Sequence, residues 1–187
     1  DRWHNTKVTD EIFEIFDDHN HLLGKAPRAE VHAKGLFHRS VHILLFNDAG
    51  DLLMQQRSPD KDVCPSCWDL SVAEHLQIGE APSQGALRGL EEELGIPRSR
   101  APRLELWRSS RLQTYESKEL GITDNEFVET YRGNFEGELI MDTVELTALE
   151  YRPISRVRTD IVEQPDLFTP WFLDEMEYLL DQKKTAR

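Results

Sequence analysis

The sequence predicts an α/β fold in which a mixed central sheet lies between helical layers. The first observation is an amphipathic helix in the middle of the chain, with segments of strand character on both sides of it. The second is a terminal amphipathic helix, which begins at Pro170 after the N-cap residue Thr169 and runs over residues 170–182. No repeat or low-complexity linker divides the chain, so we expect these elements to pack as layers of one domain.

The first half of the chain carries the clearest strand signals. Residues 41–46 are nearly all apolar, and residues 51–57 follow a turn of Asn, Asp and Gly type, so we predict a β-hairpin over 41–57. Residues 25–37 carry several charges without a period and are expected to be irregular. Further strands are predicted at 11–16, 22–24, 68–75, 104–107, 111–115, 126–131 and 145–151, and a helix at 154–163.

The stretch 74–96 reads EHLQIGEAPSQGALRGLEEELGI and contains the central helix. Pro82 suits the first turn of a helix, and Gly95 suits its end. The apolar residues of this helix recur at i, i+3 and i+7: Leu87, Leu90 and Leu94. At ~100° per residue, Glu92 and Glu93 flank this apolar face. The stretch therefore places paired carboxylates at the edge of a buried surface.

This stretch resembles the Nudix box, G-x5-E-x7-R-E-U-x-E-E-x-G-U, where U is a bulky aliphatic residue. The matching residues have the same spacing: Glu80, Arg88, Leu90, Glu92, Glu93, Gly95 and Ile96. Two positions differ, since Glu74 replaces the first glycine and Gly89 replaces a glutamate that normally binds metal. The resemblance implies a Nudix-type α/β/α sandwich with a mixed central sheet. It would form one domain over 1–187, with 1–10 as an N-terminal extension, 74–96 as the box and 170–182 as the terminal helix.

The resemblance also implies chemistry at the box. Nudix enzymes use a divalent cation to bind a diphosphate and to position the attacking water, so we expect Mg²⁺ or Mn²⁺ at Glu92 and Glu93. Glu74 would replace the missing glutamate in space; decayed hydrolase chemistry is the competing explanation. The candidates for the general base are Glu93, Glu126 and Glu74, in that order. The pair Glu80 and Arg88 would hold the loop against the helix.

The flanking residues resemble type 1 isopentenyl-diphosphate isomerase, a branch of the same superfamily. The matching residues are His38, Arg57, Lys61, Trp68, Ser71, Val72 and His75. An acidic metal-binding pair of that enzyme falls on Asp124 and Glu126, and an earlier metal-binding histidine corresponds to His32 with a shift of one position. The resemblance therefore implies His38 and His75 as metal ligands. The catalytic cysteine of the isomerase falls on Ala73, which cannot transfer a proton, so we do not expect ordinary isomerase activity.

Other polar residues have two interpretations each. Arg57 and Lys61, with Arg28 as a further arm, are predicted to bind a diphosphate, because guanidinium and ammonium groups pair with phosphate; loop solubility is the alternative. His42 lies within an apolar strand and is expected to be a core or wall residue. The pair Cys64 and Cys67 is interpreted as incidental, because one C-x2-C without a second pair is a weak zinc signal.

Composition limits the possible partners. The net charge is −13, which argues against a nucleic acid or an anionic membrane as a partner. No apolar run approaches the ~20 residues of a membrane-spanning helix, and two cysteines fit a reducing compartment such as the cytoplasm. We therefore expect hydrolysis of a small diphosphate substrate, either a nucleoside diphosphate derivative or a prenyl diphosphate. The alternative functions are an enzyme acting on isoprenoid diphosphates and a diphosphate sensor. A homodimer is a possible assembly.

Overall fold

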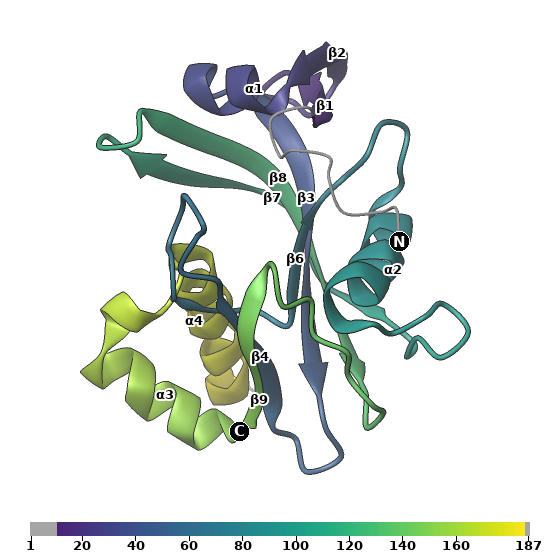
Figure 1. The fold of residues 1–187 in the computed structure, drawn as a ribbon, viewed down its shortest axis with the longest axis vertical. Coiled ribbons are helices and arrows are strands. Elements are labelled where there is room, and N and C mark those ends of the chain that lie inside the picture. The colour runs from purple at the N-terminus through teal and green to yellow at the C-terminus, as the bar shows by residue number, and fades with distance from the viewer. Residues whose placement is uncertain (1–10, 186–187) are drawn as a thin grey trace.

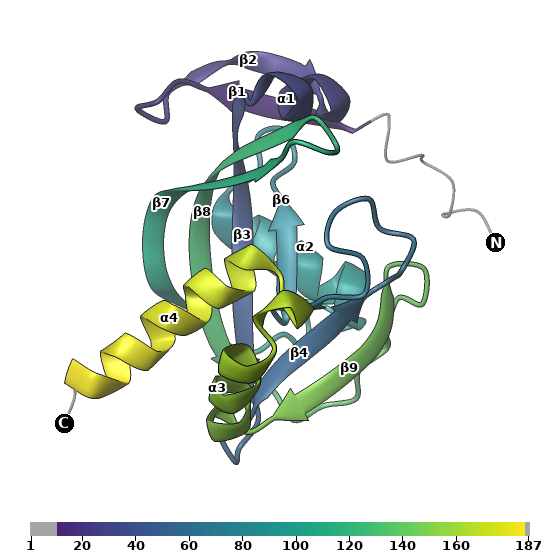
Figure 2. The same cartoon turned by 90° about the vertical axis from the view of Figure 1, so that its left-hand side faces the viewer.

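A computed structural model describes residues 11–185 and confirms the predicted α/β class. A nine-stranded mixed sheet separates helix α2 on one side from helices α3 and α4 on the other (Figures 1 and 2). The strands are β1 (Ile12–Phe16), β2 (Leu22–Pro27), β3 (Phe37–Phe46), β4 (Leu52–Arg57), β5 (Trp68–Asp69), β6 (Val72–His75), β7 (Glu105–Ser117), β8 (Ile122–Asn134) and β9 (Leu146–Arg152). The helices are α1 (Arg28–Lys34), α2 (Pro82–Leu94), α3 (Ile154–Glu163) and α4 (Pro170–Thr185), with a 3-10 turn, η2, at Pro165–Leu167.

Strand β3 is the centre of the sheet. It pairs in parallel with β8 over ten residues, from Phe37↔Asn125 to Phe46↔Asn134, and antiparallel with β6 over four. Strand β7 extends the sheet beyond β8, and β9 pairs with β4. Because β3 has helices over both faces, its middle is almost continuously apolar, as is usual for a strand buried on both sides.

The two faces of β3 differ at its N-terminal end. Val41, Ile43 and Leu45 pack in the cluster beneath α2, whereas Leu44 packs in the cluster beneath α4. Alternation places the side chains of three polar residues on the α4 side of β3, namely His38, Ser40 and His42. All three are buried, so this end of the strand presents polar groups where a core would be apolar.

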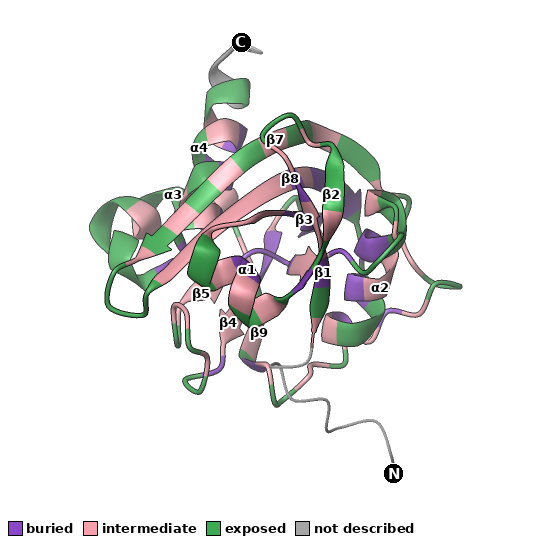
Figure 3. Ribbon diagram, turned by 90° about the horizontal axis from the view of Figure 1, so that it is seen from above, coloured by how far each residue is buried: buried purple, intermediate pink, exposed green. Residues whose placement is uncertain are grey.

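Helix α2 lies where the central periodicity predicts it. Leu90 and Leu94 are fully buried against the sheet, and the exposed side of the helix faces solvent (Figure 3). The helix ends at Gly95, whose φ of 63° is in the left-handed region that glycine adopts without a penalty. A Cβ at residue 95 would also approach the Cβ of Ile140 to 2.6 Å, so backbone conformation and packing both require glycine.

One prediction of local structure was wrong, and another was confirmed only in part. Residues 25–37 are not irregular: β2 runs to Pro27, and α1 follows it directly. This short helix is held by tertiary packing, because its fully buried Val31 contacts Phe13 and Ala26. The predicted hairpin is limited to its tip, where β3 and β4 pair only at Phe46↔Leu52. Beyond the tip the strands diverge, since β6 and β8 pair with β3 while β5 and β9 pair with β4.

The expected N-terminal extension, 1–10, lies outside the described residues, and the terminal helix continues to Thr185. Among the described helices none combines the length and apolar character that crossing a membrane requires.

Candidate functional site

Four buried or half-buried side chains converge above the polar end of β3. One ligand atom from each of His32, His38, His75 and Asp124 lies within 4.8 Å of all the others. They come from α1, β3, β6 and β8, and Glu126 completes the group because it is paired with His38 in the β3–β8 ladder. Nε2 of His75 lies 3.3 Å from Oε1 of Glu126. The sheet register thus brings together residues that are far apart in sequence.

The unpaired atoms of this cluster fit a divalent cation. Nε2 of His32, Nε2 of His38 and Oδ1 of Asp124 are buried and lack a hydrogen-bond partner within residues 11–185. Nε2 of His38 and Oδ1 of Asp124 are 3.3 Å apart, but their geometry does not form a hydrogen bond. Buried polar atoms are rarely left without a partner. Imidazole nitrogens and carboxylate oxygens are ligands of Mn²⁺ and Zn²⁺, so a bound cation would satisfy these atoms.

The electrostatics of the cluster favour the neutral form of two imidazoles, which is the form that can bind a metal ion. Burial, aided by the nearby charge of Arg28, lowers the pKa of His32 to about 3, and burial lowers that of His38 to about 4. Both rings are therefore neutral at physiological pH. Burial and the charge of Glu126 raise the pKa of Asp124 to about 7. Burial opposes charge on His75 too, but its hydrogen bond with Glu126 outweighs burial and raises its pKa.

These pKa shifts predict how metal binding depends on pH. Above pH 5, His32 and His38 are already deprotonated and need lose no proton to bind a metal ion. Asp124 and His75 take up protons as the solution becomes acidic, so a metal ion must then displace those protons. We expect Mn²⁺ affinity to fall between pH 8 and pH 6, by about tenfold per pH unit for each proton displaced. Calorimetric titration in buffers of different ionisation enthalpy measures the protons released. Asp124→Asn should release fewer of them, and metal binding without any proton release at pH 6 would contradict the assignment.

The box loop is fixed to α2 by Arg88. This guanidinium donates to both carboxylate oxygens of Glu80, at 3.0 and 2.9 Å, and to the carbonyl oxygen of His75 at 2.7 Å. The expected pair of Glu80 and Arg88 therefore forms. Arg88 also donates to Glu92, whose side chain is 55% exposed. Glu92 thus lies at the rim of the site, while Glu93 faces inward and accepts a hydrogen bond from Gln55 at 2.9 Å.

The two departures from the box pattern occupy the same space. A Cβ at Gly89 would lie 2.7 Å from Cγ1 of Val72 and 3.3 Å from Cβ of Glu74. The Glu74 side chain thus covers the position from which a side chain at residue 89 would project. Burial and the charge of Glu74 raise the pKa of Glu93 well above its ordinary value, so the two carboxyl groups are close enough to interact. This geometry supports Glu74 as the spatial replacement for the missing glutamate.

Restoring the box residue alone is expected to destabilise the protein. In Gly89→Glu, overpacking against Val72 and Glu74 costs about 1–3 kcal/mol, which exceeds the ~1 kcal/mol gained by removing a helical glycine. The double variant Glu74→Gly/Gly89→Glu should recover part of this loss, because one of the two clashing side chains is gone. Urea unfolding of the four proteins in this double-mutant cycle measures the coupling. Independent effects of the two substitutions would show that they do not share space.

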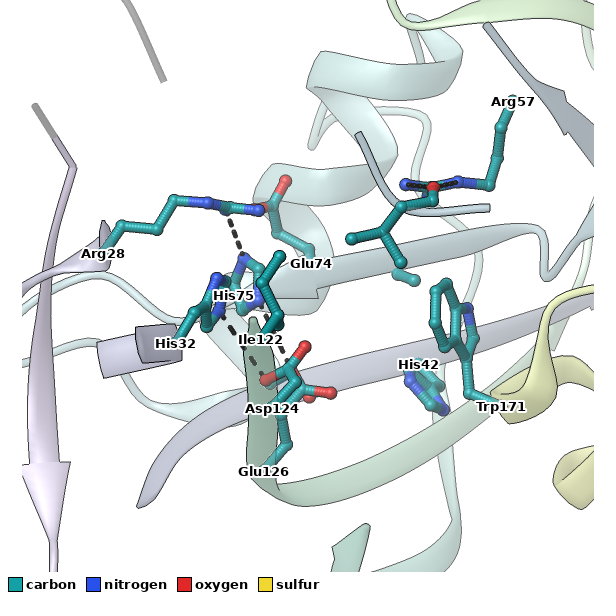
Figure 4. Close-up of a pocket in the computed structure, with 13 residues that line it drawn as sticks. Arg28, His32, His42, Arg57, Glu74, His75, Ile122, Asp124, Glu126 and Trp171 are labelled. Atoms are coloured by element: carbon teal, nitrogen blue, oxygen red, sulfur yellow. Dashed lines mark hydrogen bonds and ion pairs between the residues drawn. The ribbon is translucent and has the colours of Figure 1, made fainter. Parts of the chain in front are cut away.

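The predicted cations surround this region. Arg28 donates to Glu11 at 3.0 Å and approaches Nδ1 of His75 at 3.2 Å. Arg57 pairs with Asp69, while Lys61 pairs with Glu145. Figure 4 shows a pocket lined by Arg28 and Arg57 together with His32, His75 and the acidic pair of β8. An adjoining pocket is lined by all three cations and by Glu74, Glu92 and Glu93. The structure therefore brings the predicted phosphate-binding and metal-binding residues together.

Sequence reasoning missed one wall of the pocket. Trp171 of α4 lines it, and Glu175, one turn further along α4, accepts a hydrogen bond from His42 at 2.8 Å. The period-two pattern of His38, Ser40 and His42 was an available signal, because it places all three on one strand face. Trp171 and Glu175 carried no comparable signal, since α4 reads as an ordinary amphipathic helix.

The two cysteines show no sign of a reactive or metal-binding role. Cys64 and Cys67 are free and lie in the loop between β4 and β5. Burial raises the pKa of the Cys64 thiol to about 11 and raises that of Cys67 as well. Burial therefore favours the protonated thiol, the less reactive form, at both residues.

The group of His32, His38, His75, Asp124 and Glu126, called the metal-donor cluster below, lies on an α/β sandwich that also carries a glutamate-rich box helix. The NUDIX domain model matches residues 36–172, and the chain belongs to this family. It is 29% identical to isopentenyl-diphosphate Delta-isomerase 2 of Photorhabdus laumondii over 163 residues, covering 87% of this chain and 89% of that protein. It is 30% identical to the isopentenyl-diphosphate Delta-isomerase of Serratia proteamaculans over 171 residues, covering 91% of this chain and 92% of the other. An uncharacterized Nudix hydrolase of Pseudomonas aeruginosa is 43% identical over 93 residues, 50% of this chain and 55% of that one.

Solved structures support the fold. A protein from Deinococcus radiodurans superposes with a TM-score of 0.65 at 19% identity, covering 82% of this chain and 90% of that one. A Nudix hydrolase from M. smegmatis superposes with a TM-score of 0.56 at 15% identity, covering 93% of this chain and 96% of the other. At these identities the likeness establishes the architecture alone.

Proposed function

We propose that this chain is a divalent-metal-dependent hydrolase that cleaves a diphosphate linkage in a small molecule, with water as the nucleophile. The observation that carries the proposal is the set of buried metal-donor atoms on His32, His38 and Asp124, which have no hydrogen-bond partner among residues 11–185 and lie beside the guanidinium groups of Arg28 and Arg57. Cationic groups and metal-binding atoms in one pocket suit an anionic phosphate substrate in a chain whose overall charge is −13.

Two sets of residues would hold metal. The histidine and acid cluster, with Glu126, suits Mn²⁺ or Zn²⁺, whereas Glu74 and Glu93 offer the oxygen atoms that Mg²⁺ prefers. A bound cation supplies charge neutralisation on the phosphate and lowers the pKa of bound water. Glu92 would contribute from the rim. Each assignment rests on the donor chemistry of the side chains in the two adjoining pockets.

The environments of the acidic residues favour Glu93 as the general base and favour Glu74, whose pKa is raised by burial, over Glu126 as the next candidate. Burial and Glu74 raise the pKa of Glu93, which moves its proton affinity toward neutral pH, where a base is most effective. Burial opposes the charge of Glu126, but the hydrogen bond from His75 outweighs it and lowers the pKa of Glu126 below its ordinary range. An acid held so firmly in its ionised form is a good metal ligand and a weak base. Glu93 is therefore the first candidate, and Arg28, Arg57 and Lys61 would orient the phosphates.

The relatives named isopentenyl-diphosphate isomerases favour a second candidate, an enzyme acting on isoprenoid diphosphates. The local chemistry argues against isomerisation itself. Ala73 lies opposite His42 in the β3–β6 ladder and lines the pocket with a methyl group, which neither donates nor accepts a proton. A diphosphate-binding sensor is the third candidate, and it differs from both enzymes by the absence of turnover.

A panel of diphosphates distinguishes the three candidates. We expect phosphate-containing products from at least one nucleoside diphosphate derivative or prenyl diphosphate with Mg²⁺ or Mn²⁺, and none when EDTA is present. Mass spectrometry identifies the cleaved bond, and NMR in D₂O detects isomerisation by deuterium entering the isoprenoid. Ligand-induced thermal stabilisation without products would support the sensor, and deuterium exchange without hydrolysis would support the isomerase-like enzyme. Either result would refute the hydrolase.

A further inference from the structure

One end of the pocket contains a histidine held by a buried carboxylate. His42 and Trp171 both line the pocket, and Figure 4 shows them on the side away from Arg28 and His32. Nδ1 of His42 lies 2.8 Å from Oε1 of Glu175, which is fully buried. Trp171 and Glu175 are four residues apart on α4, so both face the sheet. None of these three residues belongs to the metal-donor cluster.

Glu175 fixes the orientation and tautomer of His42. Arg108 donates to Glu175 at 2.9 Å, and Arg111 and Thr130 donate to the same carboxylate. Burial opposes ionisation of Glu175, but these donors and His42 outweigh it and lower its pKa to about 2. The carboxylate accepts the proton on Nδ1, which leaves Nε2 of His42 available to hydrogen-bond another group.

Two polar atoms in this part of the pocket lack partners. No hydrogen bond reaches Nε2 of His42 from the described part of the chain, and Ala73, its partner on β6, has only a methyl group. Oγ of Ser40 is buried and unpartnered as well, in a residue that is 4% exposed. Both residues line the pocket. Leaving such groups unpaired beside a bound apolar ligand is costly, whereas a polar ligand would satisfy them.

The aromatic wall beside these atoms is rigid. Nε1 of Trp171 donates to Asp69 at 2.7 Å, and the guanidinium of Arg57 lies 5.6 Å from the ring centre. Tyr115 packs edge-on against the same ring at 5.8 Å. A fixed aromatic surface next to hydrogen-bonding groups suits a flat polar ring better than a flexible hydrocarbon chain.

We propose that Ser40 and His42 determine specificity by hydrogen-bonding the organic group of the substrate, and that they select a polar, hydrogen-bonding group over a prenyl chain. This inference rests on the proposed diphosphate substrate and adds its chemical class. Glu175 acts as a positioning residue, since it contacts His42 rather than the ligand. Trp171 would pack against the same organic group.

The test uses equilibrium binding in a Glu93→Gln protein with Mn²⁺, so that turnover does not interfere. The probes are uridine diphosphate, dimethylallyl diphosphate and inorganic pyrophosphate. We expect uridine diphosphate to bind at least about tenfold more tightly than dimethylallyl diphosphate. His42→Leu should weaken uridine diphosphate binding by about 10- to 100-fold, because its polar partner is lost. The same change should leave pyrophosphate binding within about twofold and should not weaken dimethylallyl diphosphate binding.

Controls make each outcome decisive. Ser40→Ala should weaken the binding of uridine diphosphate alone. The substitution removes a hydroxyl that makes no hydrogen bond to the described part of the chain, so Ser40→Ala can replace His42→Leu in the test if the latter fails to fold. The exposed His19→Leu should change nothing. An equal loss for all three probes, or no loss for any, would overturn the specificity role while leaving the hydrolase proposal intact. Failure of all three probes to bind both the Glu93→Gln protein and the unsubstituted protein would overturn both. If the three probes bind in the expected pattern but the unsubstituted protein shows no turnover, the hydrolase proposal alone would be overturned.

Discussion

Glu93→Gln is expected to lower turnover of a diphosphate substrate by about 10²- to 10⁴-fold, the usual contribution of a general base, and at the same time to stabilise the metal-free protein. The stability gain follows from the environment of the carboxyl group, whose pKa is raised by burial and by Glu74. When the pKa of an acidic group is raised in the folded state, the free energy of unfolding falls as the pH rises through that pKa, because the fold opposes ionisation of the group. Glutamine keeps the shape without the charge, and its amide can still meet Gln55.

Thermal unfolding in EDTA at pH 6 and pH 9, together with steady-state kinetics, checks this prediction. The stability advantage of Glu93→Gln should be larger at pH 9, where the parent carboxyl group is more fully ionised. Glu91→Gln is the matched control, since Glu91 is exposed on the same helix and should change neither property. If Glu93→Gln retains turnover, Glu93 is not the general base. If Glu93→Gln is less stable than the parent protein at pH 9, the fold stabilises the buried charge of Glu93.

Glu175→Ala is expected to lower the free energy of unfolding by about 3–5 kcal/mol, the usual cost of removing one partner of a buried ion pair. The loss would leave Arg108 and Arg111 without their buried carboxylate partner, so that only the half-exposed Asp174 still pairs with them in the described part of the chain. The lowered pKa of Glu175, about 2, supports the same size of effect. The stabilisation that it provides is complete above the unfolded pKa, near 4.5, and is lost as the pH falls toward 2.

Chemical denaturation at pH 7 and pH 3 measures this effect. The difference between the parent and Glu175→Ala should shrink at pH 3, because the unfolded carboxyl group then binds a proton and the parent loses part of its advantage. Glu177→Ala, an exposed position two residues away on α4, should cost less than about 0.5 kcal/mol. An equal cost at both positions, or a difference that grows toward pH 3, would contradict the role given to Glu175.

Local sequence patterns predicted α2 well. Its apolar period, the proline near its start and the glycine at its end each act over one or two turns, so they do not depend on distant packing. The same locality explains the pairing of Arg88 with Glu80, which lie within one loop and helix. Helix α1 was missed because seven residues carry a weak period and the helix depends on Val31 packing against β1 and β2.

The metal-donor cluster shows where sequence information ends. The residue types and the family resemblance indicated His38, His75, Asp124 and Glu126, but they did not establish that these side chains meet. Their meeting depends on the parallel register of β3 with β8 and the antiparallel register of β3 with β6. Register is set by non-local pairing, and a shift of one residue would turn each side chain to the other face of the sheet.

The sequence by itself determined the α/β class, the box helix and its carboxylates, and it indicated candidate residues for binding a cation and a phosphate. Only the tertiary structure decided that Glu74 occupies the space over Gly89, and that His42 is held by a carboxylate from α4. Both depend on contacts between elements, β6 with α2 and β3 with α4. Such contacts leave no periodic trace in the chain, because they are set by how layers pack and not by how a helix or strand repeats.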